Sequence, residues 1–175
     1  MNLANKITLF RIALIPLYLV LLMRQNVTAA YIATAVFVLA SLSDALDGYI
    51  ARKHSLVTTF GKFFDPLADK LLVCSALIVL SSMGRFPLLG VILIVLRELT
   101  ITGFREIAVS RGVIIAADKL GKLKAFAQMV AVIALTLPLG LHQHWLVQAL
   151  AWFAVAATVV SGGSYVVKNI HVFKD

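Results

Sequence analysis

The chain has 175 residues, enough for one domain, and 61% of them are hydrophobic while only 14% are charged. Soluble domains carry about 25% charged residues, and a chain this short cannot bury so much apolar surface in one core. The composition therefore excludes an ordinary soluble domain and predicts an integral membrane protein. The net charge of +8 would suggest nucleic acid in a soluble protein, but no aromatic residues are interleaved with the lysines, so the charge indicates anionic lipid instead.

Six apolar stretches follow one another, each near the roughly 20 residues that a helix needs to cross a bilayer. Helices satisfy their own backbone polar groups in lipid, so we predict an all-α bundle of six transmembrane helices, forming a single membrane domain over residues 1–175. Before the first stretch, Leu3, Ile7 and Phe10 recur at helical spacing and predict a short N-terminal interfacial helix. The predicted spans are Leu9–Met23, Ala29–Ile50, Phe63–Met83, Phe86–Val109, Leu120–Leu141 and Trp145–Val167.

Positive charge is distributed unevenly between the two ends of this predicted bundle. With six spans, twelve Lys and Arg residues lie on the side of the termini, whereas only Arg24 and Arg85 lie on the other side. Lys70 and Arg97 fall within spans. Because cytoplasmic loops carry the excess of Lys and Arg in membrane proteins, both termini are predicted to face the cytoplasm.

Four aspartates lie where the second predicted span ends and the third begins. Asp44 and Asp47 are three residues apart, and Asp65 and Asp69 are four apart, so each pair shares one face of its helix. The short connection between the spans brings the pairs together as a helical hairpin. Acids at a membrane boundary are costly and mark function. Hard divalent cations would relieve their repulsion, and all-oxygen ligands suit magnesium, manganese or calcium rather than zinc.

Small and basic residues accompany the aspartates in the same hairpin. Gly48 and Gly61 would let a flat ligand approach the backbone closely, although small residues also serve plain helix–helix packing in membranes. Arg52 would hold a phosphate through its planar guanidinium, or else it would be an ordinary interfacial charge.

Together these residues form the pattern D-x-x-D-G-x-x-A-R, eight further residues, and G-x-x-x-D-x-x-x-D. The pattern resembles the signature of the CDP-alcohol phosphotransferase family. The resemblance implies a membrane enzyme, commonly a homodimer, that moves a phosphatidyl group from a CDP-linked lipid to an alcohol. It also implies that Asp44, Asp47, Asp65 and Asp69 hold a two-metal site of Mg²⁺ or Mn²⁺, that Asp69 is also the catalytic base, and that Gly48, Ala51, Arg52 and Gly61 line the CDP pocket.

The acceptor alcohol has to be inferred from basic residues outside this motif. Arg105, Lys122 and Lys124 add positive charge that suits an acceptor with its own phosphate. Lys124, like Lys119, would also fit an ordinary cytoplasmic positive patch. The wider sequence resembles the branch of the family whose substrates are CDP-diacylglycerol and glycerol 3-phosphate. Ala125 departs from that branch, where threonine is expected.

Arg97 lies within the fourth predicted span and needs a partner there, because an unpaired charge is costly to bury. Glu98 or the aspartate cluster would supply that partner. A purely structural ion pair and a ligand-binding role for Arg97 are both compatible with its position.

Two other interpretations are compatible with the same residues. One keeps the chemistry but uses phosphatidylglycerol (as a cardiolipin synthase does), inositol phosphate or serine as acceptor; Arg105 and Lys122 argue against serine. The other is a divalent-cation transporter, since such proteins also carry intramembrane acids, but transporters often show repeated halves and these aspartates come from one hairpin. We expect a protein of the bacterial cytoplasmic (inner) membrane, with both termini and the active site facing the cytoplasm. Its expected partners are membrane lipids, both substrates and a second copy of the chain, with no nucleic acid.

Overall fold

The computed structural model describes residues 3–53, 59–113, 115, 119–138 and 143–170, and gives the backbone alone for 3–5, 44–53, 59–63 and 65. In this described part the chain forms six α-helices and no strand, which confirms the predicted all-α class. The helices are α1 (Leu3–Met23), α2 (Val27–Lys53), α3 (Thr59–Ser82), α4 (Leu88–Ser110), α5 (Lys119–Thr136) and α6 (Trp145–Asn169).

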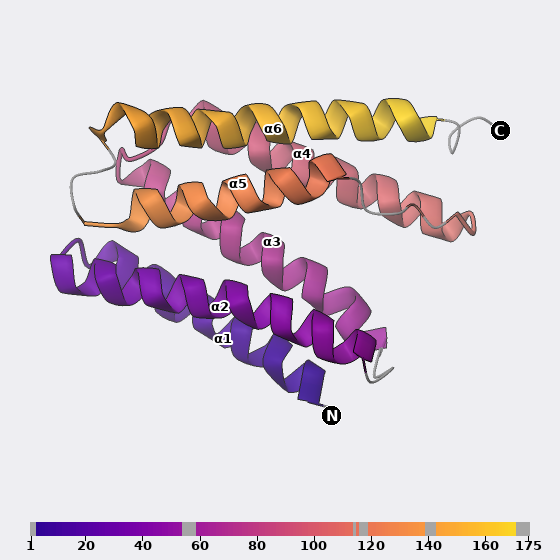
Figure 1. Ribbon diagram of the computed structural model, residues 1–175, viewed down its shortest axis with the longest axis horizontal. Coiled ribbons are helices and arrows are strands. Elements are labelled where there is room, and N and C mark those ends of the chain that lie inside the picture. The colour runs from indigo at the N-terminus through magenta and orange to yellow at the C-terminus, as the bar shows by residue number, and fades with distance from the viewer. Residues whose placement is uncertain (1–2, 54–58, 114, 116–118, 139–142, 171–175) are drawn as a thin grey trace.

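The helices pack around α3, which contacts α1, α2, α4 and α5. Figure 1 shows α1 and α2 side by side on one side of α3, and α5 and α6 together on the other. The start of α1 and the end of α6 lie at the same end of the bundle, as an even number of antiparallel helices requires. The helix that carries Asp65 and Asp69 therefore lies between the two halves of the bundle.

Apolar side chains are found on the outside of this bundle as well as in its core. Tyr18 and Phe37 are fully buried between the helices, whereas Leu99, Trp145 and Val167 are 65%, 70% and 73% exposed. Such a surface suits helices that face lipid, where the outer side chains need not be polar and tight packing holds the helices together.

Two described helical segments, Lys6–Met23 and Trp145–Asn169, are long and apolar enough to cross a membrane, and Val27–Ser43 is a shorter apolar segment. The other helices carry charged side chains along their length, including Lys70, Arg97 and Lys124, which lower their mean hydropathy. The prediction of six helices is confirmed, whereas the prediction that all six cross the membrane is supported for two of them.

The predicted interfacial helix at the N-terminus is wrong as a separate element, because α1 runs without a break from Leu3 to Met23. One side of this first part of α1 packs inside the bundle. Thr8 and Arg11 are buried, and the Arg11 Nε donates a hydrogen bond to the Ala40 carbonyl oxygen at 3.2 Å. This contact holds the first part of α1 against α2.

The fifth helix is shorter than predicted and ends at Thr136 rather than at residue 141. Pro138 follows two residues later. Proline has no backbone N–H and its ring clashes with the preceding helical turn, so helices usually end just before it. The hydroxyl groups of Thr136 and Tyr18 are 3.0 Å apart and join this end of α5 to α1.

Close approach between α4 and α6 depends on a glycine. A Cβ atom added at Gly162 would lie 2.7 Å from the Cγ of Arg97, near the stem of that side chain. A Cβ added at the neighbouring Gly163 would meet no atom within 4 Å. Gly162 therefore provides the space in which the Arg97 side chain crosses α6.

We predict that Gly162→Ala destabilises the protein by about 1–3 kcal/mol, the usual cost of overpacking. Gly163→Ala is the matched control and should leave the melting temperature unchanged or raise it, because alanine favours the helix. Thermal unfolding of both variants in detergent checks this. Equal melting temperatures for the two variants would contradict the close packing of Gly162 against Arg97.

Candidate active site

The aspartates of the motif lie on two helices that pack against each other. Asp44 and Asp47 occupy successive turns of α2, Asp65 and Asp69 occupy successive turns of α3, and α2 contacts α3. The side chain of Asp69 is exposed. The backbone thus brings the predicted metal ligands to neighbouring helices, and a set of carboxylate oxygens fits Mg²⁺ or Mn²⁺.

For most of the predicted ligand-binding residues the structure describes the backbone but not the side chain. This holds for Asp44, Asp47 and Asp65 among the metal ligands and for Gly48, Ala51, Arg52 and Gly61 among the CDP-pocket residues. All of these positions are helical in backbone; Gly61 and Asp65 lie on α3 and the other five lie on α2. Their roles therefore stay predictions.

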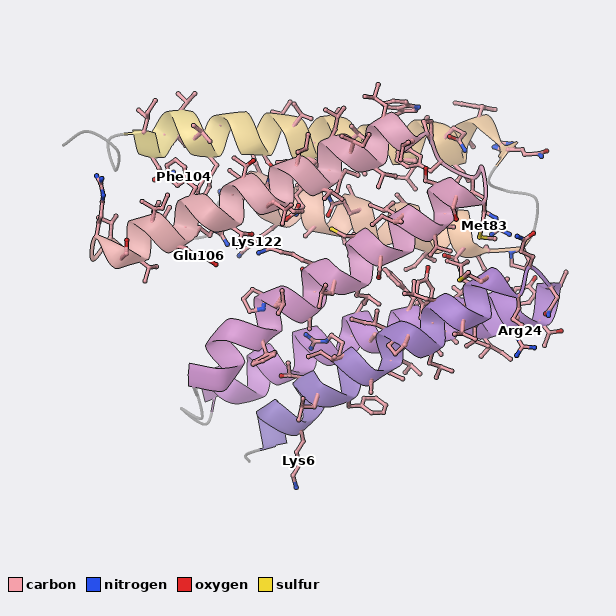
Figure 2. All side chains as sticks on the ribbon, turned by 180° about the vertical axis from the view of Figure 1, so that it is seen from behind. Lys6, Arg24, Met83, Phe104, Glu106 and Lys122 are labelled. Atoms are coloured by element: carbon pink, nitrogen blue, oxygen red, sulfur yellow. The ribbon has the colours of Figure 1, made fainter. Side chains whose placement is uncertain are left out.

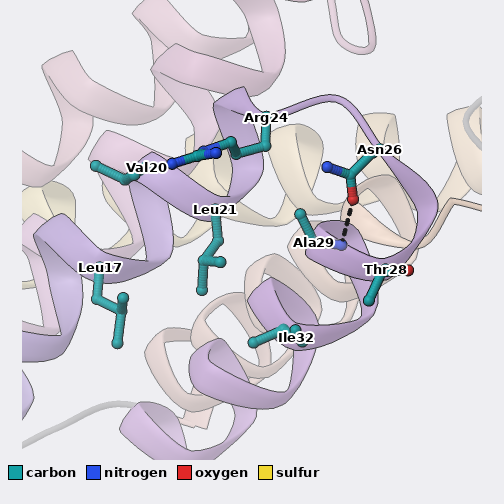
Figure 3. Close-up of a pocket in the computed structure, with 8 residues that line it drawn as sticks. All are labelled: Leu17, Val20, Leu21, Arg24, Asn26, Thr28, Ala29 and Ile32. Atoms are coloured by element: carbon teal, nitrogen blue, oxygen red, sulfur yellow. Dashed lines mark hydrogen bonds between the residues drawn. The ribbon is translucent and has the colours of Figure 1, made fainter.

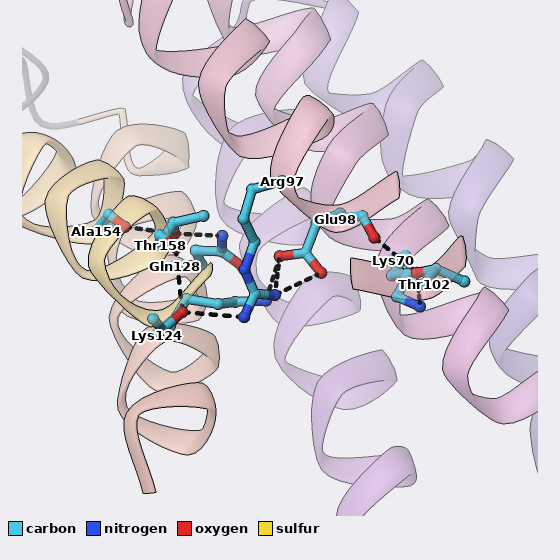
Figure 4. Close-up of polar contacts among 9 residues, drawn as sticks. Lys70, Arg97, Glu98, Thr102, Lys124, Gln128, Ala154 and Thr158 are labelled. Atoms are coloured by element: carbon cyan, nitrogen blue, oxygen red, sulfur yellow. Dashed lines mark hydrogen bonds and ion pairs between the residues drawn. The ribbon is translucent and has the colours of Figure 1, made fainter. Parts of the chain in front are cut away.

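A buried carboxylate, Glu98 on α4, is the centre of the polar interior (Figure 4). The Lys124 ammonium on α5 forms a hydrogen-bonded ion pair with its Oε1. The Arg97 guanidinium lies 3.3 Å from the same oxygen and also donates to the Ser161 hydroxyl of α6 at 3.0 Å. One carboxylate thus neutralises part of the charge of two cations and joins α4 to α5, while Arg97 extends the network to α6.

Glu98 is the buried partner of Arg97, which confirms one of the two partners predicted from the sequence. The desolvation of buried ions costs several kcal/mol each and is offset only by close pairing and additional hydrogen bonds. Beside this network the Gln128 amide donates to the Thr158 hydroxyl at 2.9 Å, so polar contacts also connect α5 with α6.

The three residues predicted to bind the acceptor phosphate have different environments. Lys124 is buried and its ammonium is already held by Glu98. Arg105 is exposed, donates from Nε to the Tyr165 hydroxyl at 3.2 Å, and lies 5.3 Å from the centre of that ring. Lys122 is exposed and makes no hydrogen bond or ion pair with another described residue. Of the three, Arg105 and Lys122 are the accessible cations.

The sequence reasoning missed a polar contact between α3 and α4. The Lys70 ammonium donates to the Thr102 hydroxyl at 2.6 Å, and that hydroxyl donates to the Glu98 carbonyl oxygen at 2.6 Å (Figure 4). A signal was present, because Lys70 directly follows a motif aspartate and lies within an apolar span.

A surface groove at the α1–α2 turn is a poor candidate for chemistry (Figure 3). Its volume is about 660 Å³, and Arg24 is its one charged lining residue. The Asn26 side chain at its rim is engaged in capping α2, where its Oδ1 accepts from the Ala29 N–H at 2.7 Å. Figure 2 shows Arg24 at the end of the bundle opposite Lys6 and Lys122. The groove is lined by Leu17, Val20, Leu21, Arg24, Asn26, Thr28, Ala29 and Ile32.

We predict that Glu98→Gln destabilises the protein by about 3–5 kcal/mol, because it leaves two cations without their buried counter-ion. Glu106→Gln removes an exposed carboxylate from the same helix and should change the stability by no more than about 0.5 kcal/mol. Thermal unfolding of both variants in detergent gives the comparison. If Glu98→Gln melts like Glu106→Gln, Glu98 is not the counter-ion that the network requires.

Comparison with known proteins agrees with the motif. Residues 1–160 match the family model of the CDP-alcohol phosphatidyltransferases. The chain is 44% identical to the CDP-diacylglycerol–glycerol-3-phosphate 3-phosphatidyltransferase of Bacillus subtilis (strain 168), over 99% of this chain and 97% of that protein. It is 39% identical to the Rickettsia typhi (strain ATCC VR-144 / Wilmington) protein of the same name, over 94% of each chain.

A third relative carries a related name. The chain is 40% identical to the probable phosphatidylglycerophosphate synthase of Mycobacterium tuberculosis (strain ATCC 25618 / H37Rv), over 97% of this chain and 82% of that protein. The family model covers the aspartate motif and all helices up to the middle of α6. From its motif, its six helices and these matches, the chain belongs to the CDP-alcohol phosphatidyltransferase family.

Proposed function

We propose that this chain transfers the phosphatidyl group of CDP-diacylglycerol to glycerol 3-phosphate, giving phosphatidylglycerophosphate and CMP. The observation that carries the proposal is the match over nearly the whole chain to relatives whose names state this reaction. The motif supports it independently, since every fixed position from Asp44 to Asp69 is filled.

The family is generally dependent on divalent metal, and the donor set of this chain fits such an ion. Asp44, Asp47, Asp65 and Asp69 would hold a two-metal site of Mg²⁺ or Mn²⁺, and Gly48, Ala51, Arg52 and Gly61 would line the CDP pocket. Bound metal would offset the negative charge of the diphosphate and of the departing CMP.

The role of Asp69 follows from the acceptor's chemistry. An alcohol is a poor nucleophile at neutral pH, so a carboxylate within hydrogen-bond reach assists by taking its proton. The hydroxyl oxygen forms a bond to the phosphatidyl phosphorus, the bond from that phosphorus to the CMP oxygen breaks, and the proton goes to Asp69. The exposed position of this side chain is compatible with access to an acceptor.

The acceptor's own phosphate requires positive charge on the same side of the membrane. Arg105 and Lys122 are exposed and would supply it, and Lys124 would contribute from its place beside Glu98. Arg105 is restrained by Tyr165, so less conformational freedom would be lost when it binds an anion. This positive charge favours a phosphorylated acceptor, such as glycerol 3-phosphate, over serine.

We also propose that all six helices cross the bacterial cytoplasmic membrane, that residues 1–175 form one domain, and that the protein works as a homodimer. Figure 2 supports the orientation, because Lys6, Glu106 and Lys122 lie at one end of the bundle and Arg24 and Met83 at the other. The end richer in Lys and Arg would face the cytoplasm, together with both termini and the active site. Membership in an enzyme family argues against the alternative of a cation transporter.

The test is an acceptor panel with purified protein in lipid vesicles. CMP release from CDP-diacylglycerol should require glycerol 3-phosphate, stop with EDTA, and return with added magnesium or manganese. Asp69→Asn should lower turnover by at least about 100-fold, the contribution of a general base, while binding of CDP-diacylglycerol stays measurable. Glu106→Gln serves as the control carboxylate.

Two results of the panel would contradict the proposal. Release with phosphatidylglycerol or inositol phosphate but not with glycerol 3-phosphate would change the acceptor and keep the family chemistry. Near-normal turnover of Asp69→Asn would show that Asp69 is not the catalytic base.

A further inference from the structure

Lys70 has a fixed position that the proposed mechanism does not yet use. Its ammonium donates to the Thr102 hydroxyl at 2.6 Å, and the same hydroxyl donates to the Glu98 carbonyl oxygen one helical turn earlier. The hydroxyl proton of Thr102 is thus engaged, so its oxygen presents a lone pair to Lys70. Thr102 therefore orients the ammonium, which keeps two further N–H donors.

Lys70 and the charged groups around it together carry more positive than negative charge, with three cations (Lys70, Arg105 and Lys124) and two carboxylates (Glu98 and Asp69). The charged groups that act on it from neighbouring helices are Glu98 and Arg105 on α4 and Lys124 on α5, with Asp69 beside it on α3. Glu98 is already shared between Lys124 and Arg97. Among the described residues, then, one buried carboxylate faces several cations, and an added anion would be attracted to this position.

The place of Lys70 on α3 separates it from the metal ligands. Asp65 and Asp69 share one side of α3 because they are four residues apart. The Lys70 side chain is rotated about 100° around the helix axis from that of Asp69, because an α-helix has 3.6 residues per turn. Its contact with Thr102 directs it toward α4. The same helix can thus present carboxylates to one substrate and an ammonium to the other.

We propose that Lys70 is an additional binding residue for the phosphate of the acceptor, and that Thr102 is the positioning residue that holds it. This inference rests on the proposed function. The half-buried ammonium next to Asp69 would bind the acceptor phosphate through charge-assisted hydrogen bonds. It would thereby hold the acceptor close to the residue that takes its proton. Arg105 would contact the same phosphate from α4.

The experiment measures KM for glycerol 3-phosphate and for CDP-diacylglycerol separately in the full-length protein in vesicles. Lys70→Gln should raise KM for glycerol 3-phosphate about 10- to 100-fold, the loss of one hydrogen bond to a charged group. KM for the lipid donor should change less than about 2-fold, within ordinary experimental scatter for an uninvolved site. Lys70→Arg should restore most of the loss, because it keeps the charge.

Thr102 provides an independent variant with a matched control. Thr102→Val should raise KM for glycerol 3-phosphate in the same direction but less, whereas Thr102→Ser should behave like the wild type. Thr34 also donates its hydroxyl to the carbonyl four residues earlier, at 2.9 Å, but this hydroxyl makes no hydrogen bond with a lysine among the described side chains. Thr34→Val should therefore leave both KM values unchanged, and Lys119→Gln controls for the loss of an exposed charge on the neighbouring α5.

The outcomes separate this inference from the proposed function. If the wild type makes no product from glycerol 3-phosphate, the proposed function fails. If the wild type is active and Lys70→Gln leaves KM for glycerol 3-phosphate unchanged, or raises both KM values equally, the inference is wrong. If Lys70→Gln does not fold, Thr102→Val and Thr34→Val carry the test, and equal KM values for these two variants would overturn it.

Discussion

A single carboxylate among apolar helices is the interaction on which the arrangement of α4, α5 and α6 depends. Glu98 is bonded to Lys124 and Arg97, and Arg97 reaches Ser161. Inside the bundle little water reaches these groups, so each charge needs a partner within the protein. Gly162 provides the space for Arg97. The helices on this side of the bundle are therefore positioned by charge pairing and close packing together, rather than by apolar burial alone.

The proposed catalytic residues are positioned mainly by α3, which packs against helices from both halves of the bundle. Two of the motif aspartates lie on one side of it, and Lys70 is directed toward α4. An enzyme that joins a diphosphate donor to a phosphorylated acceptor has to bring two anionic substrates together. Carboxylates with divalent metal on one side and ammonium and guanidinium groups on the other would hold both substrates without mutual repulsion.

Much of this could be predicted from the sequence, because apolar length and motif spacing are local properties. The six helices and the helical positions of the four aspartates followed from them. The separate interfacial helix was wrong, since nothing local shows that Arg11 bonds to Ala40, 29 positions away. The pairing of Lys124 with Glu98 joins residues 26 positions apart and depends on tertiary packing. The sequence therefore predicts an acceptor-binding role for Lys124 but does not reveal its ion pair with Glu98.

The central claim is that the metal ligands and the basic residues serve one shared site. ³¹P relaxation of glycerol 3-phosphate measures it most directly, with Mn²⁺-loaded protein in detergent and CMP in place of the lipid donor, so that no turnover occurs. The account predicts faster relaxation of the acceptor phosphorus, reversed by excess Mg²⁺ and lost in Asp65→Asn. Unchanged relaxation at an acceptor concentration that saturates turnover would mean that the acceptor phosphate does not bind near these carboxylates, and would contradict the account.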